Sequence, residues 1–202
     1  MSNVFSVPSG LSPVLLLGSF LLGSIPFAVI SMMGSGVDIR SIGSGNPGFN
    51  NVLRYSKSRA VVCLLGDLGK GVAAILLFTH ASDPVAWRWM HGLAVMLGHC
   101  YTPWLRFRGG KGVATSLGVM LVLYPWLALP CVGTYIAGRA VGKKLKWREE
   151  GARSSLASSG LFVVLVFLQD GSPAGLWALV FFAVVVWRHK ENLRRMVESP
   201  GE

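Results

Sequence analysis

Residues 106–137 read RFRGGKGVATSLGVMLVLYPWLALPCVGTYIA, a glycine-rich cationic segment followed by a long apolar run. Three cations and three glycines lie within the seven residues 106–112. Glycine lets backbone approach a ligand closely, so successive N–H groups can converge on an anion. Arg and Lys add charge and donors that suit phosphate oxygens. The segment predicts either a phosphate-binding loop beside a membrane or a solvated loop whose charge only sets topology.

The composition of the chain is that of a membrane protein. Hydrophobic residues make up 52% of the 202 residues, charged residues 14%, and the mean hydropathy is +0.54. A helix needs roughly 20 apolar residues to cross a bilayer core of about 30 Å. Six apolar runs approach or exceed that length, at residues 11–33, 60–80, 86–105, 113–137, 156–169 and 174–187.

Positive charge is confined to four segments between these runs. Of the 19 Lys and Arg residues, 17 lie in residues 40–59, 106–111, 139–153 and 188–195. Basic connectors that alternate with neutral ones follow the positive-inside rule, which places them on the cytoplasmic side. A basic surface for nucleic acid would not be divided by membrane spans, so the net charge of +10 does not predict a nucleic-acid partner.

The run 113–137 decides the number of crossings. As a single span it would place residues 143–153 on the opposite side from residues 106–111. A break at Tyr124-Pro125 returns all four basic segments to one side, and proline favours such a break because it lacks an N–H group. The sequence therefore predicts an all-α integral membrane bundle of about seven helices, some short, as a single domain over residues 1–202. The amino terminus is expected outside and the carboxyl terminus in the cytoplasm.

Several polar groups fall at the predicted inner face. Residues 43–54, GSGNPGFNNVLR, form either a tight turn or a cradle for a phosphate or a polyol phosphate. Asp67 and Lys70 lie three residues apart inside an apolar run, where they can pair on one helix face. We interpret them as a structural ion pair in preference to direct catalysis by Asp67. His99 is interpreted as a proton carrier or a brace for loop backbone. Ser154 and Ser155 are expected to cap the following helix, where an anion site is also possible.

Other familiar chemistries are missing from the sequence. The Gly-Gly-Lys-Gly segment lacks the spacing and the Ser/Thr of a nucleotide-binding P-loop. No His is followed five residues later by Asp, and no Gly-x-Ser-x-Gly elbow or His-carboxylate metal cluster occurs. Anion donors outnumber candidate bases, which predicts chemistry that relies on electrostatics and positioning.

Seven short motifs together resemble the bacterial acyl-phosphate:glycerol-3-phosphate acyltransferase family, called PlsY. In chain order they are Gly23-Ser-Ile-Pro-Phe27, Gly43-Ser-Gly-Asn-Pro-Gly48, Gly66-Asp67 with Lys70-Gly71, Gly98-His99, Gly109-Gly-Lys-Gly-Val-Ala-Thr115, Ser155-Leu-Ala-Ser158, and His189 with Asn192. Each is weak alone, but the ordered set covers nearly the whole chain and is specific.

The resemblance implies transfer of a fatty acyl group from acyl phosphate to the 1-hydroxyl of sn-glycerol 3-phosphate. The products would be lysophosphatidic acid and inorganic phosphate, as a step of phospholipid biosynthesis. It also implies a seven-helix bundle in the bacterial inner membrane, with a cytoplasmic active site and no cofactor or metal. The implied partners are the two substrates, the lipid bilayer and the soluble enzyme that makes acyl phosphate.

The same resemblance assigns roles to individual residues. His189, Asn192 and Lys111 are implied as catalytic. The implied substrate- and phosphate-binding residues are Ser44, Asn46, Asn51, Arg54, Arg108, Gly109, Gly110, Thr115 and Ser155. An oxygen of the acyl donor's phosphate is expected to accept the proton of the attacking hydroxyl, which would explain the lack of a strong base.

Four positions in three motifs depart from the family pattern. Phe49-Asn50 replaces the usual Ala-Thr, Arg108 replaces a Lys, and Lys190 replaces an Arg that offers bidentate donors. A transporter of phosphate or of an organic phosphate remains the alternative function, because it too would use glycine-rich basic loops. Such a transporter is expected to show inverted repeats and polar groups at mid-membrane. The sequence shows no internal repeat, and its motifs cluster at one face of the membrane.

Overall fold

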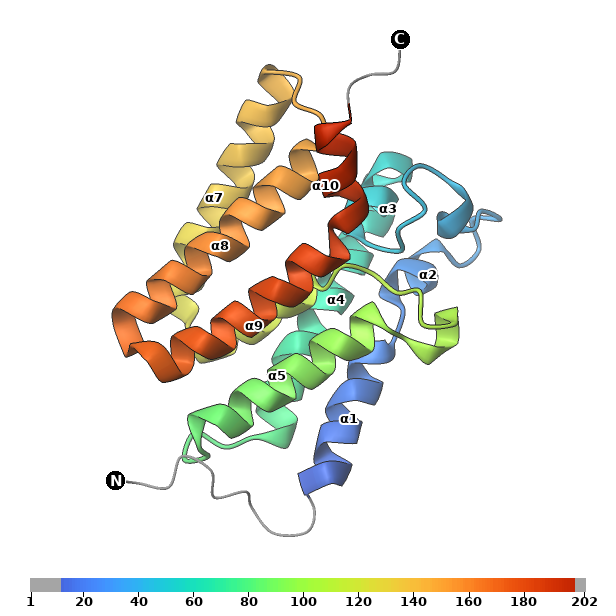
Figure 1. The fold of residues 1–202 in the computed structure, drawn as a ribbon. Helices are drawn as coiled ribbons and strands as arrows, with labels where there is room; N and C mark the ends of the chain where they lie inside the picture. Colours follow the sequence, from blue (N-terminus) through green and yellow to red (C-terminus); the bar gives the residue numbers. More distant parts are fainter. Residues whose placement is uncertain (1–11, 199–202) are drawn as a thin grey trace. The chain divides into compact units, whose positions relative to one another are not determined.

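The computed structural model describes residues 12–198 and divides the chain between Leu123 and Tyr124 into two compact units. The described part of the first unit contains α1 (Ser12–Ser24), α2 (Phe27–Met32), α3 (Phe49–Tyr55), α4 (Lys57–Phe78), α5 (Val85–Cys100) and α6 (Val113–Leu123), with short 3-10 helices η1 (Ile39–Ser41) and η2 (Pro103–Leu105). The described part of the second unit contains α7 (Pro125–Lys144), α8 (Glu150–Asp170), α9 (Ser172–Arg188) and α10 (Lys190–Val197). Figure 1 shows these helices in chain order.

The long helices coincide with the apolar runs of the sequence. Three segments are long and apolar enough to cross a membrane alone, namely Pro13–Met32, Lys57–Phe78 and Glu150–Asp170. The pair α9 and α10, bent by 61°, makes a fourth candidate. The eleven-residue α6 is about 17 Å long at 1.5 Å per residue, too short to cross unaided. The predicted all-α membrane fold with several short helices is confirmed.

The predicted break at Tyr124-Pro125 is also confirmed. Helix α6 ends at Leu123, Tyr124 has a non-helical backbone with φ −142° and ψ 62°, and α7 begins with Pro125 at its first position. The missing N–H of proline costs nothing there, because the first helical N–H groups have no partner in the helix.

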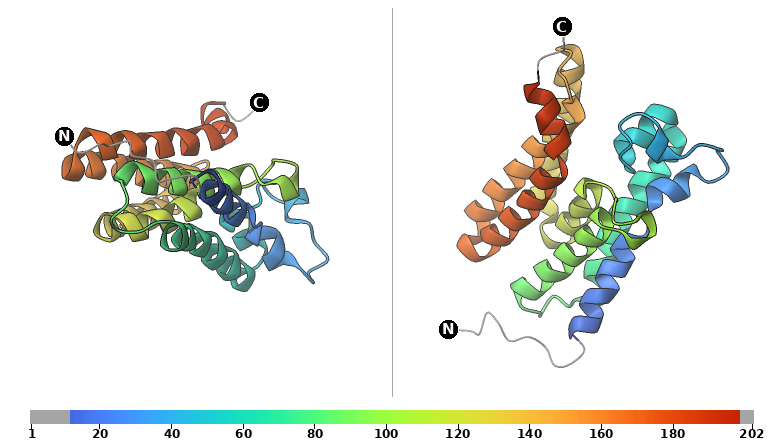
Figure 2. Two further views of the ribbon diagram at one scale, coloured as in Figure 1. Left: turned by 90° about the horizontal axis from the view of Figure 1, so that it is seen from below. Right: turned by 45° about the vertical axis from the view of Figure 1, so that its right-hand side comes forward.

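Glycines let two pairs of helices in the first unit approach closely. Within this unit α1 lies beside α5, and α4 lies beside α6 (Figures 1 and 2). A Cβ on any of four glycines would overlap a carbonyl oxygen of the facing helix; they are Gly23 and Gly98, between α1 and α5, and Gly71 and Gly118, between α4 and α6. Small residues favour helix association in membranes because backbones can then pack directly together.

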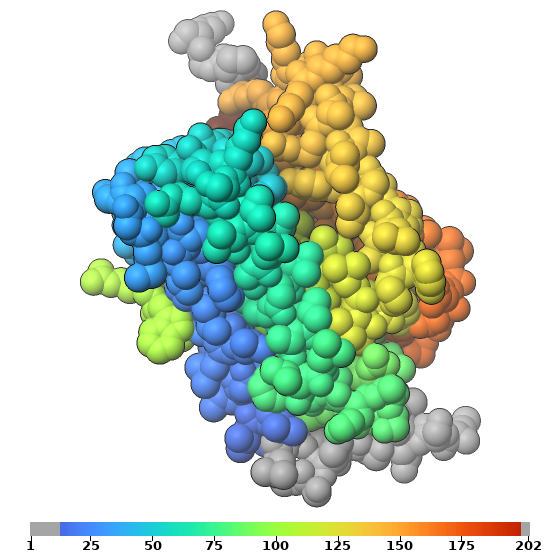
Figure 3. All heavy atoms as spheres, turned by 180° about the vertical axis from the view of Figure 1, so that it is seen from behind, coloured from blue at the N-terminus to red at the C-terminus, as the bar shows by residue number. Residues whose placement is uncertain are grey.

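Apolar side chains also cover outward faces of the helices. On α4, Val61, Val62 and Leu65 are each more than half exposed, and on α7 Trp126 is 80% exposed. In Figure 3, atoms of α4 are seen in teal and atoms of α7 in yellow. Exposed apolar area of this kind is expected where lipid, not water, covers a helix.

Candidate active site

The first candidate loop is held in shape by the buried amide of Asn51. Its Oδ1 accepts a hydrogen bond from the backbone N–H of Ser44 at 3.1 Å, and its Nδ2 donates to the carbonyls of Ile39 and Ile42 at 2.9 and 3.0 Å. Only 1% of Asn51 is exposed. Both donors of the amide are thus used inside the loop, so the structural role of Asn51 is to fix the loop, and its contact with substrate stays a prediction.

Ser44 lies between two glycines with left-handed backbone. Gly43 has φ 56° and Gly45 has φ 68°, a conformation that side chains rarely adopt. The Ser44 hydroxyl accepts a long hydrogen bond of 3.4 Å from the N–H of Asn46. Both Ser44 and Asn46 are half-buried, whereas Arg54, in the last turn of α3, is exposed. The loop therefore presents hydroxyl, amide and guanidinium groups within twelve residues.

The second candidate loop runs from η2 to Gly112 and folds back on the end of α5. Gly109 N–H donates to the Cys100 carbonyl at 3.1 Å, and Gly110 N–H donates to the His99 carbonyl at 3.2 Å. These two N–H groups thus have partners within the protein, and the phosphate-binding role of Gly109 and Gly110 stays a prediction. These glycines allow close approach, because a Cβ on Gly109 would overlap the carbonyl oxygen of His99.

The charged groups of this loop and the hydroxyl of Thr115, just after it in α6, differ in exposure. Arg108 is exposed, Lys111 is half-buried, and Thr115 is fully buried near the start of α6. The hydroxyl oxygen of Thr115 has no hydrogen-bond partner among the described residues. A buried polar atom of that kind is costly unless a ligand or water satisfies it, which agrees with the predicted role of Thr115.

The predicted ion pair of Asp67 and Lys70 is confirmed, and it includes His99. Lys70 Nζ lies 2.8 Å from Asp67 Oδ1, while His99 Nδ1 lies 2.8 Å from Lys70 Nζ and 3.3 Å from Asp67 Oδ1. The side chains of Lys70 and Asp67 are only 1% and 3% exposed. We call Asp67, Lys70 and His99 the ion cluster.

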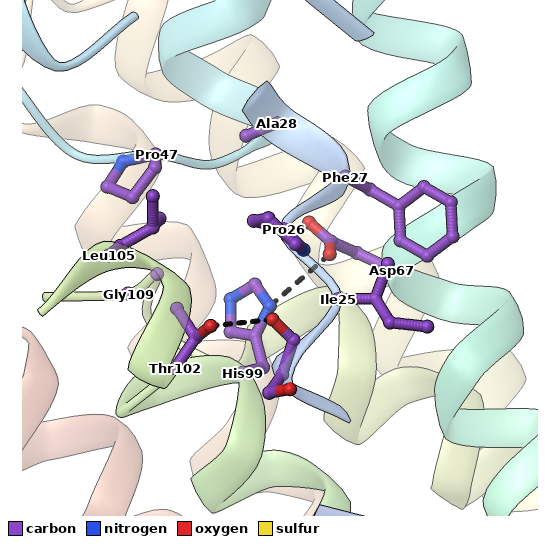
Figure 4. A pocket seen from close by; sticks show the side chains of 12 residues that line it. Ile25, Pro26, Phe27, Ala28, Pro47, Asp67, His99, Thr102, Leu105 and Gly109 are labelled. Atoms are coloured by element: carbon purple, nitrogen blue, oxygen red, sulfur yellow. Dashed lines mark hydrogen bonds and ion pairs between the residues drawn. The ribbon is translucent and has the colours of Figure 1, made fainter. Parts of the chain in front are cut away.

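A small pocket in the first unit brings the two candidate loops together beside the ion cluster. Its lining includes Pro47 of the first loop, Gly109 and Gly110 of the second, and the side chains of Asp67 and His99. Figure 4 shows the His99 ring pointing from the end of α5 toward Asp67, with Pro47 and Gly109 at the same pocket.

The second unit carries the two other predicted catalytic residues at the junction of α9 and α10. Both are buried, at 2% exposure for His189 and 5% for Asn192. His189 Nδ1 donates to the Val185 carbonyl at 2.7 Å, which fixes the proton on Nδ1 and makes Nε2 of the neutral ring an acceptor. Asn192 Nδ2 donates to Glu149 Oε2 at 2.6 Å.

Glu149 is a residue that the sequence did not single out. Besides Asn192, its carboxylate accepts a hydrogen bond from Arg195 at 3.1 Å. Its backbone is left-handed, with φ 55°, immediately before α8. Glu149 and Asn192 are 43 residues apart, and no local spacing pattern signals such a pair.

Ser155 lies farther inside its helix than the sequence suggested. Helix α8 begins at Glu150, and the hydroxyls of Ser154 and Ser155 donate to the carbonyls of Glu150 and Gly151, four residues earlier. The expectation that these serines cap the helix is wrong, because the helix already begins about one turn before them. The binding role of Ser155 stays a prediction.

The ion pair of Asp38 and Arg40, beside the first candidate loop, shifts the pKa of both side chains. Arg40 donates to Asp38 through its side chain, at 2.7 to 3.1 Å, and through its backbone N–H. These bonds lower the pKa of Asp38 to about 2, and the same carboxylate raises the pKa of Arg40. Asp38 is thus ionised at any physiological pH and caps η1.

No group of three or more His, Cys, Asp or Glu side chains in residues 12–198 is arranged to hold a metal ion. The three cysteines, Cys63, Cys100 and Cys131, are buried thiols. The candidate site residues of the two units carry hydroxyls, amides, cations and the imidazoles of His99 and His189.

Lipid-facing helices, with polar groups gathered in glycine-rich loops and at one helix junction, define a helical integral membrane enzyme. Residues 13–199 match the glycerol-3-phosphate acyltransferase family over nearly the whole chain. The chain belongs to that family. This decides against the transporter that the sequence left as an alternative.

Curated relatives and solved structures agree with this assignment. The chain is 37% identical to the glycerol-3-phosphate acyltransferase of Geotalea daltonii over 91% of its length and 92% of the relative's. It is 41% identical to that of Laribacter hongkongensis, with 90% of each chain covered. The crystal structure of PlsY (YgiH), an integral membrane glycerol 3-phosphate acyltransferase, in its glycerol 3-phosphate form is similar with a TM-score of 0.79 at 31% identity, over 93% of this chain and 92% of that one. Its lysophosphatidic acid form gives a TM-score of 0.77.

Proposed function

We propose that this membrane acyltransferase takes its acyl group from acyl phosphate and transfers it to the 1-hydroxyl of glycerol 3-phosphate. The observation that carries the proposal is the match, over 93% of the chain, to an acyltransferase structure in its glycerol 3-phosphate form. The similar structure in a lysophosphatidic acid form supports the identity of the product. A family match that spans residues 13–199, and so includes parts of both compact units, supports a single functional domain over residues 1–202.

The reaction balances without a protein base. The oxygen of the glycerol 3-phosphate hydroxyl attacks the acyl carbon, the bond from that carbon to the phosphate oxygen breaks, and inorganic phosphate leaves. An oxygen of that phosphate takes the hydroxyl proton. The side chains then have to hold two phosphate groups and stabilise the negative charge that develops on the acyl oxygen.

Residues of both units fit these tasks. Lys111, Arg108 and Arg54 supply positive charge for phosphate, and Ser44, Asn46 and Thr115 supply hydroxyl and amide groups. In the second unit, His189 and Asn192 orient or polarise a substrate. The proton on His189 Nδ1 is committed to the Val185 carbonyl, so a neutral ring acts through Nε2 as an acceptor.

The active site faces the cytoplasm of a bacterial cell in this proposal. Four basic segments hold 17 of the 19 Lys and Arg residues, and the positive-inside rule places such segments in the cytoplasm. The soluble enzyme that makes acyl phosphate would then deliver its product from the same side. Thiol labelling of single-cysteine variants in intact cells, at positions 57 and 172, tests this orientation. Equal labelling of position 57 and position 172 by a membrane-impermeant reagent would contradict it.

The decisive assay uses purified protein with glycerol 3-phosphate and, in separate reactions, acyl phosphate, acyl-coenzyme A and acyl carrier protein thioester. We expect lysophosphatidic acid and an equal amount of phosphate from acyl phosphate alone. Product from a thioester but not from acyl phosphate would refute the donor, and phosphate uptake by liposomes without any acyl product would refute acyl transfer. Lys111→Met should lower kcat/KM about 100-fold, as expected for loss of a charged contact, whereas Lys57→Met, an exposed lysine outside the candidate loops, should not.

A further inference from the structure

The ion cluster is a costly arrangement for the middle of an apolar helix. Lys70 Nζ contacts Asp67 Oδ1 and His99 Nδ1, both at 2.8 Å, and also donates to the Ile25 carbonyl at 3.0 Å. Charges inside a membrane span cost several kcal/mol unless they are partnered. Even a partnered buried ion pair is often no more stabilising than well-packed apolar side chains. Stability alone therefore does not account for the cluster.

The opposite edge of the His99 ring lies against the second candidate loop. A Cβ on Gly110 would overlap His99 Nε2 and lie 2.7 Å from Cε1, so the ring edge touches the backbone of Gly110 directly. The His99 carbonyl accepts the Gly110 N–H at 3.2 Å. The imidazole is thus clamped between the charges of α4 on one side and the glycine backbone on the other.

The first candidate loop rests on the same glycine. A Cβ on Gly110 would lie 3.0 Å from the carbonyl oxygen of Pro47. Lys70 also donates to the Ile25 carbonyl, at the break between α1 and α2. Pro47, Gly109, Gly110, Asp67 and His99 line one pocket (Figure 4).

We propose that the ion cluster is a positioning site for catalysis: Asp67 and Lys70 orient the His99 imidazole, and the imidazole sets the separation of the two candidate loops. This role rests on the proposed function, because it assumes that the loops at Pro47 and Gly110 bind substrate. None of the three residues needs to touch a reacting atom. Loosening the ring should therefore weaken substrate binding by displacing the loops.

The first test replaces His99 and compares KM with kcat. His99→Phe keeps a ring against Gly110 but removes the contacts to Lys70 and Asp67. We expect KM for glycerol 3-phosphate or for acyl phosphate to rise at least tenfold. His91→Phe is the matched control. His91 is fully buried in the same helix, eight residues before His99, and its side chain contacts Ser19 at 2.7 Å. It should lower the thermal midpoint while leaving both KM values unchanged.

A purely structural role predicts a different result. Both variants would then lose activity only in proportion to the folded fraction, with unchanged KM values, and that outcome overturns the positioning role. Stabilisation of the purified protein by glycerol 3-phosphate provides a readout that does not depend on turnover. We expect His99→Phe to lose most of this thermal shift and His91→Phe to keep it.

A double variant tests the contact between the ring and the loop, and it needs no apolar residue at position 99. Gly110→Ala places a methyl group against the ring and should lower kcat/KM at least tenfold. His99→Asn keeps a polar group near Lys70 and removes the ring atoms that the methyl group would meet. In the His99→Asn background the effect of Gly110→Ala should therefore be at least tenfold smaller, whereas additive effects would contradict the proposal.

Different results overturn the proposed function and the positioning role of the ion cluster. Absence of lysophosphatidic acid from the unchanged protein overturns the proposed function. Product from the unchanged protein, together with unaltered KM values in His99→Phe and additive effects in the double variant, overturns only the positioning role.

Discussion

The contact of α1 with α5 predicts a large effect from a single methyl group. In Gly98→Ala the new Cβ would overlap the carbonyl oxygen of Phe20 and lie 2.9 Å from its carbonyl carbon. Ordinary contact begins at 3.4 Å, so the two backbones must separate by at least 0.5 Å (3.4 minus 2.9). Overpacking of this kind costs about 1–3 kcal/mol. For a chain of this size that corresponds to a fall of about 2–12 °C in the thermal midpoint.

The assay is thermal unfolding in detergent, followed by tryptophan fluorescence, with kcat/KM measured on the same samples. Gly69→Ala in α4 and Gly133→Ala in α7 are matched controls, because a Cβ at either glycine meets nothing within 4 Å. These controls should leave the midpoint unchanged or raise it, since alanine favours a helix by about 0.5–1 kcal/mol over glycine. A Gly98→Ala midpoint equal to those of the controls would refute direct backbone packing between α1 and α5.

Three further predictions concern charge and cofactors. Glu149→Gln should lower kcat/KM about 10-fold or more, because it weakens charge-assisted hydrogen bonds that hold Asn192; Glu150→Gln, which weakens only the pair with Arg139 at 3.0 Å, should have a much smaller effect. Asp38 has a pKa lowered from 3.8 to about 2, so its pair with Arg40 is complete above pH 3.8 and is lost only as the pH falls toward 2. The pH profiles of the unchanged protein and Asp38→Asn should therefore have the same shape between pH 5 and 9, and a new inflection in that range would contradict this. Treatment with EDTA should leave kcat unchanged, and loss of activity that zinc or magnesium restores would show a metal requirement.

Local patterns in the sequence were enough to predict the long helices and the break between α6 and α7, but not the break between α1 and α2 or the short helix α3. The apolar runs coincide with the long helices, and Tyr124-Pro125 separates α6 from α7 because proline constrains its own and the preceding residue. The pairing of Asp67 with Lys70 follows from a spacing of three residues on one helix. Each of these features depends on residues that are close in the chain, so it can be predicted from local sequence patterns.

Contacts between distant segments were not predictable in the same way. The partnership of Glu149 with Asn192 and the clamping of His99 against Gly110 depend on how helices and loops pack. The second candidate loop is the clearest example of a contact that the sequence does not predict. Its glycines suggested N–H groups that are free to bind an anion. Two of those N–H groups instead bond to the end of α5, which only the three-dimensional path of the chain reveals.

The hydrogen bonds of Asn51 have a consequence for the energetics of substrate capture. Three bonds, to Ser44, Ile39 and Ile42, already fix the first loop when the protein folds. Fixing backbone costs about 1–2 kcal/mol per residue in conformational entropy, and here that cost is met before any substrate arrives. Association then carries little further ordering penalty for this loop, so more of the interaction energy remains available for affinity. In the proposed function this loop is a preorganised receptor, and its affinity for phosphate would depend on the buried amide of Asn51 as well as on the cations at its surface.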